Sequence, residues 1–165
     1  MKRLILHWTA GKYSPNACDL EHYHYLVDGC GEIFKGKYKP EDNIDCTDEN
    51  YARHTGGGNT NSIGVAICGM LGFKNERNVG NYPITLVQFE RTMKLCAEIL
   101  NKYGLSPNSL LTHYEFGQAH PTTTSYGKID IIHIPPYPAV TRHEVGNFIR
   151  SKVKWYKDKY NSIIK

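Results

Sequence analysis

Three side chains of this sequence are of the types that hold a catalytic metal ion: His7, His113 and Asp130. His7 ends one short apolar run and His113 follows another, so both are expected at strand ends, where side chains can reach a cleft. Two imidazoles and one carboxylate would leave the fourth position of a zinc ion open for water, as a hydrolytic site requires. Because the chain has eight histidines, two of them could stand at strand ends by chance, and spacing alone does not establish a metal site.

The elements expected to position these residues are strands and helices in mixed order. Residues 85–103 form the clearest helix: Thr85 and Gln88 make a capping-box pattern, apolar residues recur at helical spacing, and Gly104 fits the end. The run 63–68 is apolar throughout, which is typical of a central strand buried on both faces. Also expected are a strand at 3–7, a helical turn at 18–22, a hairpin of 23–27 and 32–34, a strand at 110–114 and a helix from about 141 to about 161.

The segment between His113 and Asp130 is expected to be a long loop. Gly117, Pro121, three successive threonines and Gly127 favour loops and turns over regular structure. A loop of this length inside a compact domain is usually functional or disordered, and the nearby candidate ligands favour the first. The order of elements predicts one α/β domain over residues 1–165, with a mixed central β-sheet flanked by α-helices.

Composition limits the classes of protein to consider. With 40% hydrophobic and 22% charged residues the chain is typical of a globular domain, and no apolar run approaches the ~20 residues of a membrane span. The start lacks the apolar region of a secretory signal, and five cysteines without a C-x-x-C pair fit reduced thiols of a protein made in the cytoplasm. The net charge of +4 favours acidic partners, and nucleic acid, anionic lipid and anionic wall polymers all fit.

Five sequence segments together resemble the type-2 N-acetylmuramoyl-L-alanine amidases, a group that includes small phage endolysins and peptidoglycan-recognition proteins. They are HWTAG, YHYLVDGCGEIFKG, RHTGGGNTNSIGVAICG, THYEFG and GKID. The resemblance covers about residues 3 to 155. It implies a mixed sheet with helices against it, a zinc ion in a surface groove, and cleavage of the bond between the lactyl group of N-acetylmuramic acid and L-alanine.

The resemblance also implies roles for single residues. His7 and His113 match the two histidine ligands of the family, and Asp130 matches its third ligand, which is Asp or Cys in different members. Tyr23 matches a tyrosine near the water of the zinc site, where it would orient that water or pass a proton. Lys128 matches the basic residue two places before the third ligand and would stabilise the oxyanion. Zinc would lower the pKa of its water to about 7 and polarise the amide carbonyl.

Four further residues are candidates for contact with substrate. His54 aligns with a groove histidine of the family, and His24 is either a groove residue or a histidine bonded within the sheet. Asn59 would contact glycan or peptide, although asparagine in a glycine-rich turn often caps its own backbone. Tyr114 flanks a ligand and would stack on sugar, although packing is the commoner fate of an aromatic side chain.

Two features depart from the family pattern. The recycling branch has a catalytic glutamate on the N-SIGV strand, whereas this chain has Ala66 there. The insertion QAHPTTTSY also lengthens the segment between His113 and Asp130, so Glu115 and His120 are alternatives for the third ligand.

The resulting expectation is a hydrolase with one zinc ion per chain that acts on peptidoglycan, not on nucleic acid, as a monomeric phage or prophage endolysin without a separate wall-binding domain. It would be made in the cytoplasm without a signal peptide and reach the cell wall after release, for example through a holin. The alternatives are a recognition module that binds peptidoglycan without cutting it, an envelope-targeting toxin and a recycling enzyme.

Overall fold

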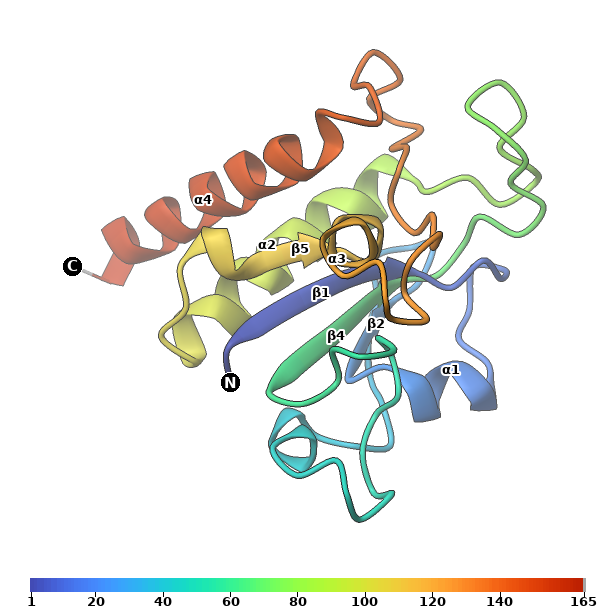
Figure 1. Ribbon diagram of the computed structural model, residues 1–165. Helices are drawn as coiled ribbons and strands as arrows, with labels where there is room; N and C mark the ends of the chain where they lie inside the picture. Colours follow the sequence, from blue (N-terminus) through green and yellow to red (C-terminus); the bar gives the residue numbers. More distant parts are fainter. Residues whose placement is uncertain (165) are drawn as a thin grey trace.

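The protein is described by a computed structural model that covers residues 1–164 (Figure 1). Five strands, four α-helices and two short 3-10 helices make up its regular structure. In chain order they are β1 (Arg3–Trp8), α1 (Ala17–His22), β2 (Tyr25–Val27), β3 (Ile33–Lys35), η1 (Pro40–Asn43), β4 (Ser62–Ile67), α2 (Leu86–Lys102), η2 (Pro107–Ser109), β5 (Leu110–Thr112), α3 (His113–Ala119) and α4 (Val145–Ile164).

The strands form one mixed sheet in the order β3-β2-β4-β1-β5. β1 runs parallel to both β4 and β5, β2 runs parallel to β4, and β3 is antiparallel to β2. The four parallel strands therefore end at the same edge of the sheet. Because Leu6 pairs with Thr112, the residues that follow them, His7 and His113, lie next to each other at that edge.

The two faces of the sheet carry different layers. Helices α2 and α4 pack on each other and on one face (Figure 1), where alternate strand residues such as Leu4, Leu6 and Val65 join the main core. Helix α1 lies on the opposite side, where a smaller cluster contains Leu26 and Ala66. Side chains alternate across a strand, so His7 points away from the α2 and α4 layer. The fold class expected from the sequence is confirmed.

The segment after His113 differs from expectation. The prediction that it contains no regular structure is wrong, because His113–Ala119 forms α3. Thr112 caps this helix: its Oγ1 accepts the Glu115 N–H at 3.1 Å, and the Glu115 carboxylate accepts the Thr112 N–H at 3.0 Å. The T-x-x-E pattern that marks such a start is present in the sequence and outweighs the glycine at 117.

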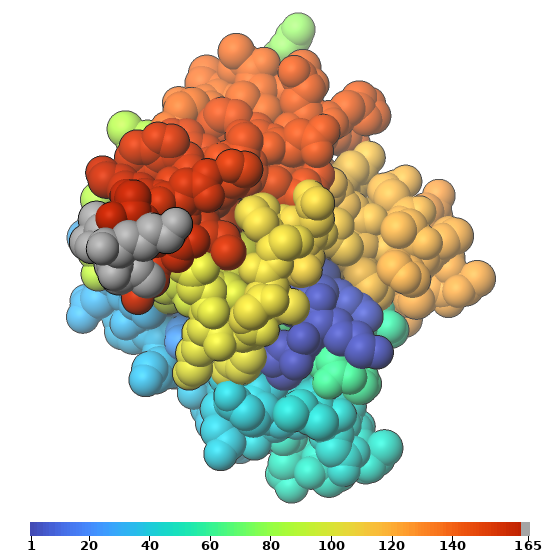
Figure 2. Space-filling model, turned by 90° about the vertical axis from the view of Figure 1, so that its left-hand side faces the viewer, coloured from blue at the N-terminus to red at the C-terminus, as the bar shows by residue number. Residues whose placement is uncertain are grey.

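Helix α4 begins later than expected, at Val145. Thr141 and Glu144 have the spacing of a capping box, and the Thr141 hydroxyl donates to the Glu144 carboxylate at 2.6 Å. This pair closes a turn before the helix and does not start it. Within the described part of the chain, none of the helices combines the length and apolar character needed to cross a bilayer. In the space-filling view, the segment around residue 120 stands out beside the start of β1 (Figure 2, light orange and dark blue).

Candidate metal centre

His7, His113 and Asp130 converge on one point at the carboxyl edge of the sheet. The two Nδ1 atoms lie 3.1 Å apart, and Asp130 Oδ2 lies 3.0 Å from His7 Nδ1 and 3.1 Å from His113 Nδ1. His7 is fully buried and His113 is 5% exposed. Three atoms that can each donate a lone pair thus form a nearly equilateral triangle.

This triangle has the size that a tetrahedral zinc site requires. With Zn–N and Zn–O distances near 2.1 Å, two ligand atoms of a tetrahedron lie about 3.4 Å apart. The observed edges of 3.0 to 3.1 Å need only a small expansion to match. The donor set, two imidazole nitrogens and one carboxylate, is also one that zinc takes in hydrolytic sites. The residues present therefore fit a zinc ion.

The protonation states agree with a ligand set. Burial lowers the pKa of His7 to about 4, so this imidazole is neutral near pH 7. Burial by itself would raise the pKa of Asp130, but hydrogen bonds with His113 and His7 outweigh it and hold that pKa below its usual range. A neutral imidazole and a charged carboxylate are the forms that bind metal.

The backbone after Asp130 is held in an unusual conformation. Ile131 has a φ of 64°, in the left-handed region that β-branched residues rarely occupy, and its side chain is 1% exposed in the core. Such a conformation costs about 1–3 kcal/mol and persists only where the surroundings enforce it. Packing of Ile131 therefore helps to direct the preceding carboxylate toward the two histidines.

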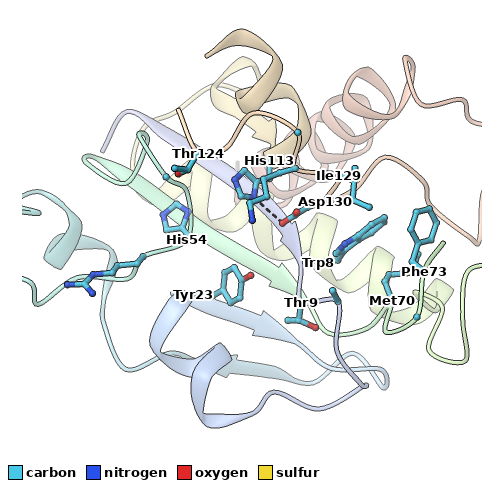
Figure 3. A pocket seen from close by; sticks show the side chains of 16 residues that line it. Trp8, Thr9, Tyr23, His54, Met70, Phe73, His113, Thr124, Ile129 and Asp130 are labelled. Atoms are coloured by element: carbon cyan, nitrogen blue, oxygen red, sulfur yellow. Dashed lines mark hydrogen bonds and ion pairs between the residues drawn. The ribbon is translucent and has the colours of Figure 1, made fainter. Parts of the chain in front are cut away.

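An open pocket of about 580 Å³ gives access to this centre, and His113 and Asp130 line it. Figure 3 shows that the pocket has two different ends. Trp8, Met70 and Phe73 gather at one end, and His54 and Thr124 lie at the other (Figure 3). A ligand in this pocket meets an apolar wall on one side of the centre and polar groups on the other.

Two residues with expected catalytic roles also line the pocket. The Tyr23 ring lies 5.1 Å from the His7 ring between centroids. Burial, followed by the negative charge of Asp130, raises the pKa of Tyr23 well above its usual value. Its phenol therefore keeps its proton and can donate a hydrogen bond. Lys128 is exposed at the pocket wall.

Of the four residues expected to contact substrate, the structure brings His54 to the pocket. His24 is 1% exposed and bonds to Asn43 and to the Gly64 N–H. The Asn59 carboxamide oxygen accepts the backbone N–H groups of residues 54 and 55, so it caps its own loop. Tyr114 packs against the main core beside a separate hollow.

The two alternatives for the third ligand have other partners. Glu115 makes a bidentate ion pair with Arg150, with distances of 2.8 and 2.9 Å. His120 stacks on Phe116 at 4.1 Å between ring centroids, and its Nδ1 lies 2.9 Å from the Phe116 carbonyl oxygen. In the structure Asp130, and neither of these residues, joins the two histidines.

Two hydroxyl groups that were not expected from the sequence lie behind the histidines. Ser125 Oγ lies 3.0 Å from His113 Nε2. Thr55 Oγ1 lies 3.3 Å from His7 Nε2 and 2.7 Å from His54 Nδ1. A hydroxyl residue in a polar loop carries no signal in one sequence. The only local feature of the sequence that indicated a role for Thr55 is the neighbouring His54.

Comparisons with known proteins identify the family of the chain. The chain matches the family model described as N-acetylmuramoyl-L-alanine amidase over residues 1–130. A search of curated protein sequences returned no match.

Solved structures show a similar fold. A mutant of PlyL has 20% identity and a TM-score of 0.53, covering 93% of this chain and 84% of that one. The hydrolase AmiA of Staphylococcus aureus, in complex with its ligand, has 18% identity and a TM-score of 0.52, covering 94% and 75%. The N-acetylmuramyl-L-alanine amidase AmiD from E. coli, in complex with an anhydro-N-acetylmuramic acid peptide, has 19% identity and a TM-score of 0.51, covering 72% and 50%. Because the family match spans most of the sequence, the chain belongs to the N-acetylmuramoyl-L-alanine amidase family.

Proposed function

We propose that this chain is a zinc-dependent amidase that hydrolyses the bond between the lactyl group of N-acetylmuramic acid and L-alanine in peptidoglycan. The observation that carries the proposal is the convergence of two imidazole nitrogens and one carboxylate oxygen, 3.0 to 3.1 Å apart, beside an open pocket. Membership of the amidase family supports the choice of bond.

The residues that would hold zinc are His7 and His113, through Nδ1, and Asp130, through Oδ2. When bound by three protein ligands, zinc supplies Lewis acidity, which polarises a carbonyl and makes water acidic near neutral pH. The negative carboxylate of Asp130 would neutralise part of the positive charge of the zinc ion. Burial of both histidines keeps bulk water from competing for their lone pairs.

Two further side chains act on the substrate in this proposal. Tyr23 keeps its phenolic proton, because burial raises its pKa, so its Oη–H donates to water or to a substrate oxygen and does not act as a base. Lys128 places a positive charge at the pocket wall, where it stabilises the carbonyl oxygen of the scissile amide as that oxygen becomes anionic. The polar end of the pocket holds the groups that orient the amide.

Digestion of purified sacculi tests the bond that is cut. Mass spectrometry should identify intact glycan strands and free peptides that begin with L-alanine. The His113→Ala variant, which lacks one of the three donors, should release neither. Muropeptides with cleaved glycosidic bonds would contradict the proposal and indicate a glycosidase.

Metal analysis distinguishes an enzyme from a recognition module. We expect about one zinc ion per chain, since three protein ligands form one site, and a chelator should abolish lysis until zinc is restored. Tight binding of muropeptides by a protein that takes up no zinc would favour the module.

We further propose that the chain serves as an endolysin, which its resemblance to small phage endolysins supports. Expression of the chain in bacteria with a holin should cause lysis, and expression without the holin should not. Growth without lysis in both cases would exclude this role, while leaving the amidase reaction to be judged on sacculi.

A further inference from the structure

The insertion between α3 and Asp130 places a buried hydroxyl group directly behind His113. Ser125 is fully buried, and its Oγ lies 3.0 Å from His113 Nε2 and 2.7 Å from the carbonyl oxygen of Gly56. The nitrogen contacted by Ser125 is the one on the far side of the ring from the metal centre. Ser125 therefore affects His113 without occupying the position of a ligand.

The hydrogen-bonding capacities of these three groups determine where the protons lie. A carbonyl oxygen only accepts, so the single hydroxyl proton of Ser125 is donated to Gly56. Toward His113 the Ser125 oxygen can then only accept, which requires a proton on Nε2. A neutral imidazole carries one N–H, and its Nδ1 is then a bare lone pair directed at the metal centre.

Asp130 favours the opposite tautomer. Its Oδ2 lies 3.1 Å from His113 Nδ1 and would accept a proton from that nitrogen. In that arrangement Ser125 would have to donate to Nε2, and the Gly56 carbonyl would lose the hydroxyl that the structure gives it. Ser125 thus requires one tautomer of His113 and Asp130 favours the other, and only the tautomer required by Ser125 leaves Nδ1 free to bind a cation.

The position of Ser125 is fixed by contact between two distant loops. A Cβ atom added at Gly56 would overlap Thr124 Oγ1, and one at Gly57 would overlap the Thr123 methyl group. The glycines therefore let the threonine-rich loop lie directly against the 54–58 loop. This close approach brings the Gly56 carbonyl within hydrogen-bonding distance of Ser125.

We propose that Ser125, supplied by the insertion and held by the Gly56 carbonyl, is a positioning residue that keeps His113 in its Nε2–H tautomer and so keeps Nδ1 available for zinc. The proposal rests on the proposed function in one respect, that the cation is zinc. Partners of this kind behind a ligating histidine typically change metal affinity ~10–100-fold.

The test uses the full chain and four proteins: wild type, Ser125→Ala, Ser125→Thr and Thr123→Ala. The last is the matched control, because the Thr123 hydroxyl also makes one hydrogen bond within this loop, to the His120 carbonyl at 2.8 Å, but does not contact His113. Long-range proton–nitrogen NMR spectra of the metal-free proteins in alkaline buffer report which nitrogen of His113 carries the proton. Competition with a chromophoric chelator reports the affinity for Zn²⁺.

We expect the Nε2–H form in wild type and Thr123→Ala, and a shift toward the Nδ1–H form in Ser125→Ala, with a ~10–100-fold loss of Zn²⁺ affinity. Ser125→Thr retains the hydroxyl and should restore both properties. An Nδ1–H tautomer in metal-free wild type would overturn the proposal, and so would unchanged affinity in Ser125→Ala. If Ser125→Ala does not fold, an Nδ1–H tautomer in the wild-type spectrum still overturns the proposal. Because the tautomer is read without metal or substrate, failure of the amidase assay on sacculi would not be confused with failure of this proposal.

Discussion

The buried histidine of the sheet, His24, should make the fold sensitive to mild acid. Its Nδ1 accepts the Gly64 N–H at 2.9 Å and its Nε2 donates to Asn43 Oδ1 at 2.9 Å. Burial lowers the pKa of His24 to about 4. A second proton would have to bind Nδ1, which already accepts the Gly64 N–H. Two N–H groups would then point at each other, so protonation of His24 is unfavourable in the folded state.

The pKa values set the size and the direction of the effect. The unfolded chain has the ordinary value of 6.5, so above that pH both states are neutral and stability is unaffected. As the pH falls from 6.5 toward 4, the unfolded state binds a proton that the folded state does not, and the free energy of unfolding decreases. The decrease in the free energy of unfolding is at most about 3.4 kcal/mol, and about 2 kcal/mol of it has occurred near pH 5.

Urea unfolding at about pH 7.5 and about pH 5, in the presence of a chelator, measures this contribution. A glutamine at position 24 does not titrate, so His24→Gln should lose about 2 kcal/mol less than wild type between the two pH values. His143→Gln, which removes an exposed histidine, is the matched control and should follow wild type. Equal losses in wild type and His24→Gln would refute the reasoning.

Three further predictions concern the metal centre and the residues around it. Asp130→Ala should lose zinc, whereas Glu115→Ala should keep zinc and lower only the thermal midpoint, since Glu115 pairs with Arg150. Loss of zinc in Glu115→Ala but not in Asp130→Ala would show that Glu115, and not Asp130, is the third ligand. Lys128→Ala should lower turnover ~10²–10³-fold with zinc content and thermal midpoint unchanged; near-normal cleavage of sacculi would remove this lysine from the mechanism. Gly64→Ala should destabilise the fold by about 1–3 kcal/mol, because a Cβ there would lie 2.5 Å from the His54 ring; an unaltered urea midpoint would show that the ring moves freely.

The sheet, its central strand and the long helix follow from local patterns in the sequence. Residues 63–68 are continuously apolar and Thr85 and Gln88 mark a helix start, and β4 and α2 lie within one residue of these expectations. Helix α3 was not expected, because Gly117 and Pro121 favour a loop. Tertiary contacts decide such cases: Gly117 lies so close to the Ser125 carbonyl that no Cβ would fit.

The set of candidate ligands follows from residue types and from the family resemblance, but their supporting groups do not. His7 and Asp130 are 123 positions apart, and their convergence depends on strand register and on the unusual backbone of Ile131. The choice between Asp130 and Glu115 needed the position of Arg150, which approaches from α4. No pattern in a single sequence encodes such a contact between distant segments.

The position of β1 also bears on how the chain reaches its folded state on the ribosome. β1 precedes both of its partners, β4 and β5, in the chain. More than 100 residues therefore separate its synthesis from that of β5, and its backbone groups are paired on both sides only after β5 has been made. Folds dominated by such distant pairings form slowly. Terminal residues are often dispensable, but removal of the first eight would take out an interior strand together with His7. A nascent chain that stops before residue 130 lacks part of the centre.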